Sequence, residues 1–380
     1  MLETTRFLRE NGMDWSLLES RFGISVTKSP CGNMMKLSYS QIDSPKMEPI
    51  VMECRGLILY AEDAFPVAVP FDRFFNFGEA LEITSQFVWG DSVAAFEKVD
   101  GSLSILAFDH RHSNEWFFTT RGSFAEGELI PGKSWKEMMW AAAPPKRKIE
   151  NVLDQKVTYI FEYCSPYNKV VRDYREPIMY LLAARHNETL VEFSDEELDA
   201  LALELGVLRP ERYVITSPSE ADKFILDRSE GDATWEGLVC KDVNGLRVKI
   251  KSPKYLSLHH MKDNGNIFLP KNLISFVLAA ERDELVVYFP EVGPYYDKLM
   301  DWTEKQFTSL VSVMESAKTL ESQKDFALYI TKEVPTPFAS LLFRLKAEGK
   351  LNVPDLRDMW ISSKDLIVKV LDREGFSYDL

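Results

Sequence analysis

The sequence predicts an α+β fold, in which antiparallel sheets with flanking helices are followed by a small all-α domain. Up to about residue 260, short runs of β-branched and aromatic residues alternate with turn-forming residues, a pattern typical of antiparallel strands. Beyond that point, apolar residues recur at three- and four-residue spacing, as in amphipathic helices. The chain has 380 residues, 45% of them hydrophobic and 12% aromatic, which is enough for two well-filled cores.

The first part of the chain contains five clear strand patterns. They cover Gly56–Tyr60, Leu103–Phe108, Trp116–Thr120, Val157–Glu162 and Leu246–Lys251. Two helices are predicted among them, over Lys133–Ala143 and over Leu198–Leu205. The second follows Ser194-Asp195-Glu196-Glu197, a helix start signal in which a serine precedes an acidic first turn.

The second part contains five helical patterns. They cover Leu273–Ala280, Tyr295–Ala317, Ser322–Ile330, Pro337–Lys346 and Ser363–Leu371, and Pro270, Pro290, Pro335 and Pro354 lie near the predicted breaks. We therefore predict two domains, 1–258 and 259–380.

Composition excludes several classes of protein. No basic-then-apolar leader is present at the N-terminus, and no apolar run approaches the roughly 20 residues of a membrane helix, so we expect neither secretion nor membrane insertion. The four cysteines are widely spaced, which favours reduced thiols in a cytoplasmic protein. The formal charge of −14 means that any contact with nucleic acid must be local.

The segment Lys98-Val99-Asp100-Gly101 carries the most informative chemistry. A lysine that attacks a phosphorus atom must be neutral near pH 7, although the ordinary lysine pKa is about 10.4. Neighbouring cations lower that pKa, and Lys249 and Lys251, two residues apart on a strand, present two ammonium groups on one face. The same pair can stabilise charge on a phosphate.

If the phosphorus that the lysine attacks belongs to a nucleoside triphosphate, the reaction also requires a divalent metal, and such metals prefer carboxylate oxygens as ligands. Glu162, Glu236 and Asp100 are the candidate metal ligands, and Gly101 allows a sharp turn beside the nucleotide. Taken singly, these residues have ordinary interpretations, such as a surface lysine or a solvated strand face. Their order and their neighbours decide between the two interpretations.

Four segments resemble, in sequence order, the motifs of the covalent nucleotidyltransferases, which include polynucleotide ligases and capping guanylyltransferases. They are Phe96-Glu97-Lys98-Val99-Asp100-Gly101-Ser102, Phe161-Glu162-Tyr163, Trp235-Glu236-Gly237-Leu238-Val239 and Arg247-Val248-Lys249-Ile250-Lys251. Other segments are similar to the phage tRNA-repair RNA ligases (the RNA ligase 1 family). They are Glu53-Cys54-Arg55-Gly56, Arg73-Phe74-Phe75-Asn76-Phe77, Thr120-Arg121-Gly122-Ser123, 165–171 and 255–259.

This resemblance implies a nucleotidyltransferase domain of the ATP-grasp-like ligase type. It assigns catalysis to Lys98, Glu162, Glu236, Lys249 and Lys251. It assigns nucleotide contacts to Tyr39, Arg55, Arg73, Phe75, Glu97, Val99, Gly101, Arg121, Glu162, Glu236, Lys249 and Lys251. Arg73 and Arg121 stand where the family has lysines, so the charge is kept but the contact geometry differs.

The implied reaction uses ATP and Mg²⁺, with Mn²⁺ as an alternative metal, and joins RNA ends that carry a 5'-phosphate and a 3'-hydroxyl. Broken tRNA is the expected substrate, and the helical domain is expected to give RNA specificity, because the DNA ligases and capping enzymes of the superfamily have a β-rich domain there. We expect a monomer in the cytoplasm, or in the host cytoplasm if the source is viral.

Three other interpretations stay open at this point. Gly127-Glu128-Leu129-Ile130-Pro131-Gly132-Lys133-Ser134 matches the P-loop pattern, but Pro131 removes one of the N–H groups that cradle phosphate and Glu128 adds negative charge. A related guanylyltransferase would share the motifs. A noncatalytic RNA-binding protein could use the same scaffold, although none of the expected functional groups is missing.

Overall fold

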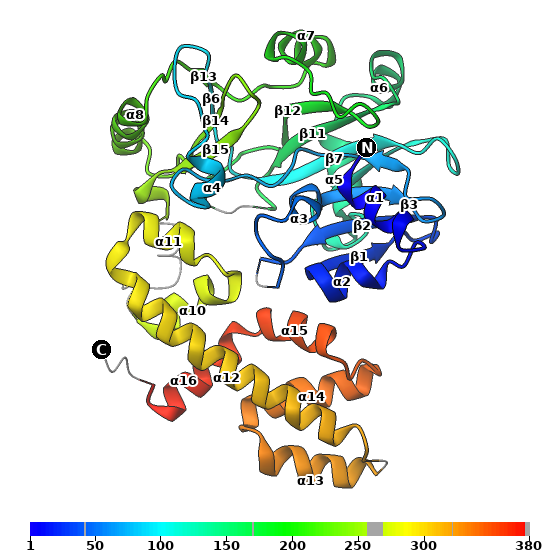
Figure 1. The fold of residues 1–380 in the computed structure, drawn as a ribbon, viewed down its shortest axis with the longest axis vertical. Coiled ribbons are helices and arrows are strands. Elements are labelled where there is room, and N and C mark those ends of the chain that lie inside the picture. The colour runs from blue at the N-terminus through cyan, green and yellow to red at the C-terminus, as the bar shows by residue number, and fades with distance from the viewer. Residues whose placement is uncertain (42, 169–170, 257–268, 321, 377–380) are drawn as a thin grey trace. The chain divides into compact units, whose positions relative to one another are not determined.

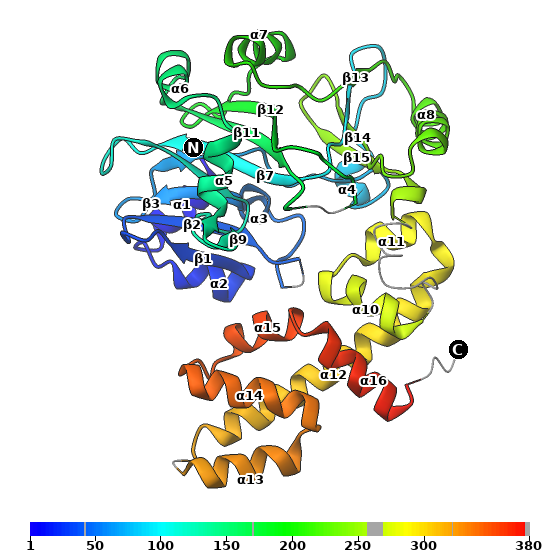
Figure 2. The same ribbon diagram turned by 180° about the vertical axis from the view of Figure 1, so that it is seen from behind.

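The computed structural model describes residues 1–41, 43–168, 171–256, 269–320 and 322–376. Its contacts divide the chain into two compact units, Met1–His259 and His260–Leu380 (Figures 1 and 2). The predicted boundary between residues 258 and 259 lies outside the described residues. So do residues 169–170 and 257–259, which belong to two of the segments that resemble the RNA ligases.

Three main sheets form the first unit, and the α+β prediction is confirmed. The first sheet has the order β1-β2-β3-β4, the second β12-β11-β7-β8 and the third β13-β6-β14-β15-β5. Their strands are β1 Ile24–Lys28, β2 Met34–Tyr39, β3 Arg55–Tyr60, β4 Pro66–Ala68, β5 Phe75–Asn76, β6 Ala94–Glu97, β7 Ser102–Phe108, β8 Trp116–Thr120, β11 Val157–Cys164, β12 Ile178–His186, β13 Arg212–Tyr213, β14 Gly237–Lys241 and β15 Arg247–Lys251.

One strand pair departs from the predicted antiparallel pattern. β5 pairs with β15 in parallel, with Val248 opposite Phe75. Antiparallel pairing is favoured where two consecutive strands are joined by a short turn, and these two strands are far apart in the sequence, so no turn fixes their direction.

Helices cover the outer faces of these sheets. They are α1 Glu3–Glu10, α2 Ser16–Phe22, α3 Pro49–Glu53, α4 Leu81–Thr84, α5 Trp135–Ala142, α6 Lys146–Val152, α7 Asp195–Leu205 and α8 Pro218–Gly231. Apolar side chains of α5, α6 and α7 pack on the second sheet, α1 to α3 on the first and α8 on the third. On the opposite side, apolar residues of the first and second sheets form a further shared core, which includes Ile58 and Ile105.

Two helix starts test the predicted boundaries. Ser194 caps α7 as the start signal predicts, because its side chain accepts the Glu197 N–H while Glu197 accepts the Ser194 N–H. The predicted helix Lys133–Ala143 begins later, at Trp135. Ser134 forms the same capping arrangement with Glu137, so the residues before the cap cannot be helical.

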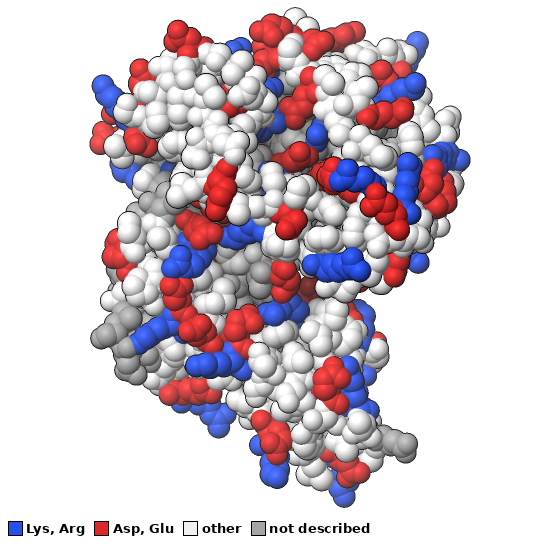
Figure 3. All heavy atoms as spheres, viewed as in Figure 1, with Lys and Arg blue, Asp and Glu red and all other residues white. Residues whose placement is uncertain are grey.

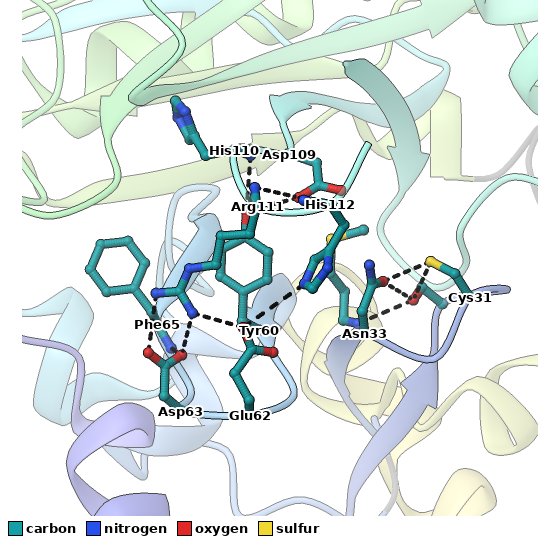
Figure 4. Close-up of polar contacts among 12 residues, drawn as sticks. Cys31, Asn33, Tyr60, Glu62, Asp63, Phe65, Asp109, His110, Arg111 and His112 are labelled. Atoms are coloured by element: carbon teal, nitrogen blue, oxygen red, sulfur yellow. Dashed lines mark hydrogen bonds and ion pairs between the residues drawn. The ribbon is translucent and has the colours of Figure 1, made fainter. Parts of the chain in front are cut away.

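The first and second sheets are joined at the turn that follows β7, as Figure 4 shows. The Tyr60 hydroxyl donates to Asp109 Oδ1 at 2.9 Å and accepts the His110 N–H at the same distance. The Arg111 guanidinium lies 4.3 Å from the centre of the Tyr60 ring and pairs with Asp63 and Glu62. These contacts join the two sheets where β3 and β7 end. Arg55 and Thr120 lie at the opposite end of the sheets.

The second unit is helical, as predicted. Its elements are α10 Pro270–Ala279, α11 Arg282–Tyr288, a short 3₁₀ helix Pro290–Val292, α12 Gly293–Ala317, α13 Gln323–Glu333, α14 Thr336–Glu348, α15 Val353–Ile361 and α16 Lys364–Glu374. Their apolar faces share one core around Tyr296, Phe307, Leu342 and Trp360. Among the described residues, no helix is both long and apolar enough to cross a lipid bilayer.

Pro354 shows why α15 was not predicted. A proline usually indicates a helix break, but this one lies in the first turn of α15. Backbone N–H groups in a first turn have no acceptor within the helix, so the missing N–H of proline costs no hydrogen bond there. Asn352 caps this helix by accepting the Asp355 N–H at 2.9 Å.

Candidate active site

Strand pairing in the third sheet brings Lys98 next to Glu236. Lys98 follows β6, Glu236 precedes β14, and the two strands pair with Glu97 opposite Leu238. The Lys98 N–H donates to the Gly237 carbonyl at 2.8 Å, which fixes the backbone of the lysine. Lys98 Nζ then lies 2.7 Å from Glu236 Oε1, and the Glu236 side chain is only 6% exposed.

Two glycines allow the backbone beside Glu236 and Lys98 to pack closely against neighbouring strands. Gly237 has a φ of 151°, and a Cβ there would lie 2.1 Å from the Ile250 carbonyl oxygen. At Gly101, a Cβ would lie 2.6 Å from the Tyr163 carbonyl oxygen and 2.7 Å from Cys164 Sγ. Gly101 lies in a bend, as expected, and the close packing of the Lys98 loop on β11 leaves no room there for a side chain.

The two lysines of β15 share one face, as their spacing predicts. Arg247, Lys249 and Lys251 alternate with the buried Val248 and Ile250. Lys251 Nζ lies 3.7 Å from Glu236 Oε1, so this carboxylate contacts two of the predicted catalytic cations.

Glu162 projects from β11 into the same region. Burial raises the pKa of its carboxyl to about 8, the negative charges of Glu236 and Asp100 act in the same direction, and Lys98 and Arg55 oppose them. The described residues contain no group of three metal-ligating side chains. Two carboxylates nevertheless suit Mg²⁺, which commonly binds through one or two protein carboxylates together with substrate phosphates.

Asp100 is placed differently from the other predicted metal ligands. Its Oδ2 accepts the N–H groups of Val171 and Arg172 at 2.9 and 2.8 Å, and its Oδ1 accepts the Tyr255 hydroxyl at 3.0 Å. Both oxygens are thus engaged by protein donors. This carboxylate holds three segments of chain together, and its role as a metal ligand stays a prediction.

A pocket of about 750 Å³, part of which is open to solvent, lies beside Lys98. Of the predicted site residues, Arg55, Glu97, Lys98, Val99 and Glu162 line it. Arg55 Nη1 is buried without a hydrogen-bond partner, while its guanidinium lies 4.8 Å from the Phe71 ring and 4.9 Å from the Phe74 ring. A phosphate oxygen would give this buried donor the hydrogen-bond acceptor that it lacks.

The remaining predicted cations gather around Tyr39. The guanidinium of Arg73 lies 4.3 Å and that of Arg121 5.6 Å from the centre of the Tyr39 ring. Burial would raise the pKa of the Tyr39 hydroxyl, but the charges of Arg55, Arg121, Arg73 and Lys249 outweigh it and lower the pKa. Residues from four separate parts of the sequence therefore create one positive region suited to a polyphosphate.

Phe75 and Glu97 have structural partners of their own. Phe75 is 1% exposed, and its ring lies 5.3 Å from the Arg73 guanidinium, so it supports that arginine. Glu97 forms an ion pair with Arg172, from the loop that Asp100 also holds.

The far end of the cavity is built from residues that the sequence did not reveal. Asp195, Leu198 and Arg209 line it, and the Arg209 guanidinium donates to Asp199, to Asp195 and to the carbonyl groups of Leu181 and Leu182. Asp195 reads only as the acidic first turn of a helix. No local signal in the sequence connects it to the site.

The segment that matches the P-loop pattern is a hairpin. Strands β9 Glu128–Ile130 and β10 Lys133–Ser134 pair in an antiparallel manner, and Ser134 is occupied as the cap of α5. A P-loop requires a phosphate-binding loop between a strand and a helix, and a hairpin occupies this segment instead, so the geometry does not support the P-loop interpretation.

Comparison with known proteins gives the family. The family model described as RNA ligase matches residues 53–255, more than half of the chain. A protein of Autographa californica nuclear polyhedrosis virus, named for polynucleotide kinase and RNA ligase activities, is 29% identical over 374 residues. That match covers 93% of this chain and 51% of the viral protein, so the chain spans about half of that relative's length.

Two further comparisons cover most of the chain. The RNA ligase of Rhodothermus phage RM378 is 25% identical over 340 residues, which is 72% of this chain and 76% of the phage protein. A solved archaeal ATP-dependent RNA ligase matches with a TM-score of 0.46 and 19% identity, over 82% of this chain and 83% of that one. On the strength of the family match, this chain belongs to the RNA ligase family.

Proposed function

We propose that the protein is an ATP-dependent RNA ligase that joins a 5'-phosphate end to a 3'-hydroxyl end. The observation that carries the proposal is that Lys98 and Glu162 line one cavity, while Glu236 contacts both Lys98 and Lys251. An ordinary surface lysine at the end of a strand is not expected to lie among two carboxylates and a second cation, whereas a catalytic lysine is.

In the first step, Lys98 Nζ attacks the α-phosphorus of ATP. The bond to the bridging oxygen breaks, pyrophosphate leaves, and the amine loses a proton as the lysyl-AMP bond forms. A 5'-phosphate oxygen of RNA then attacks the same phosphorus and returns the lysine, giving an RNA capped by AMP. Finally, the 3'-hydroxyl attacks the RNA 5'-phosphorus, forms the phosphodiester and releases AMP.

The residues around Lys98 fit these steps. Lys249 and Lys251 would bind the α-phosphate and stabilise the charge that develops on it. Arg55, Arg73 and Arg121 would hold the β- and γ-phosphates in the positive region around Tyr39. Glu162 and Glu236 would hold Mg²⁺, or Mn²⁺, which when bound offsets the negative charge of the phosphates.

RNA must bind to a protein whose formal net charge is −14. Acidic and basic side chains are interspersed over the face shown in Figure 3, which presents no large patch of one sign. The cations gathered near the site are the candidates for phosphate contacts. We infer that broken tRNA is the substrate, with specificity from the helical unit, and that the protein acts as a monomer in the cytoplasm, or in a host cytoplasm if its source is viral. These inferences rest on the resemblance to tRNA-repair ligases.

An end-joining assay tests the function. A 5'-phosphorylated single-stranded RNA and a tRNA cut in its anticodon loop are each incubated with Mg²⁺ and either ATP or GTP. The proposal expects joined RNA with ATP, and preferential repair of the cut tRNA. Product formed only with GTP would indicate a guanylyltransferase, and RNA binding without adenylylation or joining would indicate a noncatalytic scaffold.

A further inference from the structure

Lys36 is a buried amine that the proposed reaction does not use. Its side chain projects from β2, the residue is 1% exposed, and Nζ donates to Thr119 Oγ1 at 2.9 Å. The centre of the Phe124 ring lies 5.6 Å from Nζ. Burial lowers the pKa of Lys36 to about 7, so a charged form here is costly.

The same strand makes a second contact just beyond the end of β8. Ser38, two residues along, lies on the same side of β2 as Lys36, and its Oγ donates to the Arg121 carbonyl at 2.7 Å. Gly56 permits this close approach from the adjoining strand β3. A Cβ at Gly56 would lie 3.1 Å from the Arg121 carbonyl oxygen and 3.2 Å from its Cα.

Arg121 leads directly from this anchored strand end into a tight turn. The Ser123 N–H donates to Thr120 Oγ1 at 3.1 Å, and the Thr120 N–H donates to the Ser123 carbonyl at the same distance. The backbone of Arg121 therefore follows the position of Thr119, and its side chain reaches the Tyr39 ring. The hydrogen bonds from Lys36 and Ser38 therefore hold the chain at Thr119 and at Arg121, the two ends of this short segment.

We propose that Lys36 and Ser38 are positioning residues that hold Arg121 in place for the polyphosphate of ATP. The inference rests on the function proposed above and adds two residues that touch neither nucleotide nor metal.

A purely structural role for Lys36 explains the contacts less well. The first and second sheets are already joined at their other end by Tyr60 and Asp109. A methionine would fill the same space without the cost of a buried amine. What the amine adds is a directed hydrogen bond to β8, the strand that Arg121 follows.

Self-labelling of the full chain with ATP tests this inference, with the half-saturating ATP concentration measured apart from the rate at saturating ATP. For Lys36→Met and for Ser38→Ala we expect roughly a fivefold rise in half-saturating ATP, the effect of one lost hydrogen bond, and a saturated rate within about twofold of wild type. Lys28→Met, a change at an exposed lysine of the adjoining strand β1, is the matched control and leaves both values unchanged.

A double-mutant cycle separates positioning from general loosening of the fold. Thr119→Val removes the acceptor of Lys36, so we expect it to raise half-saturating ATP as Lys36→Met does, and the double variant to be no worse than either single one. Unchanged half-saturating ATP in folded Lys36→Met and in Ser38→Ala overturns the inference. If Lys36→Met does not fold, Ser38→Ala decides alone. A wild-type protein that takes no label overturns the proposed function instead, and this inference falls with it.

Discussion

The ammonium group of Lys98 and the carboxylate of Glu236 lie 2.7 Å apart, although 138 positions of sequence separate the two residues. The contact follows from the pairing of β6 with β14, because each residue stands directly beside one of the paired strands. The nucleophile and its carboxylate are thus set by a backbone ladder and not by a mobile loop. This gives a rigid place in which to bind the α-phosphate of ATP.

Replacing Glu236 with glutamine should lower the rate of self-labelling at least about tenfold, because the side chain loses the charge that contacts both Lys98 and Lys251 and that would hold the metal. The rate is measured at saturating ATP and Mg²⁺. Glu128→Gln, at an exposed glutamate of the β9 strand, is the charge-matched control. Equal rates for Glu236→Gln and wild type would contradict the role given to this carboxylate.

Glu162→Gln should stabilise the fold, increasingly so at higher pH. The native pKa of about 8 exceeds the ordinary value of 4.5, so between these values the unfolded state ionises while the native state stays protonated. Wild-type stability therefore falls as pH rises from about 4.5 to 8, and glutamine avoids that loss, which is on the order of a few kcal/mol.

Thermal unfolding of Glu162→Gln and wild type at pH 5 and at pH 8.5, without nucleotide, checks this sign. The difference in Tm should be small at the lower pH and several degrees at the higher one. A variant that is less stable than wild type at pH 8.5 would show that the carboxylate is stabilised by its surroundings rather than penalised. The same variant should label poorly, because it lacks a metal ligand.

Gly237→Ala should weaken the fold by about 1–3 kcal/mol or more, because the new Cβ would lie 2.1 Å from the Ile250 carbonyl oxygen and force β14 and β15 apart. Urea unfolding gives the change in free energy. At Gly127, a Cβ would have no other atom within 4 Å, so Gly127→Ala should stay within about 0.5 kcal/mol of wild type. Matching unfolding curves for the two variants would contradict the close approach.

Removing divalent metal should abolish labelling without unfolding the protein. The carboxylates of Glu162 and Glu236 can serve Mg²⁺ only together with substrate phosphates, so EDTA should leave the Tm of the nucleotide-free protein unchanged. Adding Mg²⁺ together with ATP should raise that Tm more than either alone. Full labelling in metal-free buffer would rule out the metal role of these two residues.

Much of the first unit was predictable because its signals are local. The strand over Trp116–Thr120 has the predicted bounds, and the Ser194 cap starts α7 where the sequence indicates. Pro354 misled because a proline has one meaning in a helix interior and another in a first turn. The direction of β5 depends on a pairing with β15 that no local pattern encodes.

The candidate site also contains residues that local sequence signals indicate and residues that only the fold brings there. Lys98, Glu162, Glu236 and the β15 lysines stand in recognisable segments, and the structure brings them to one region. Lys36 and Arg209 stand in no such segment, because their roles arise from what the fold places beside them. Asp100 stands in a recognisable segment, but its hydrogen bonds to Val171 and Tyr255 depend on the fold and have no local signal in the sequence.

The most direct test of the central claim is labelling with ATP that carries a radioactive α-phosphate, in Mg²⁺, followed by denaturing electrophoresis of wild type, Lys98→Ala and Lys133→Ala. The account predicts a labelled band that survives denaturation, disappears on acid treatment as a phosphoramidate does, and is absent only from Lys98→Ala. A wild-type protein without label, or labelling that depends on Lys133 and not on Lys98, would contradict it.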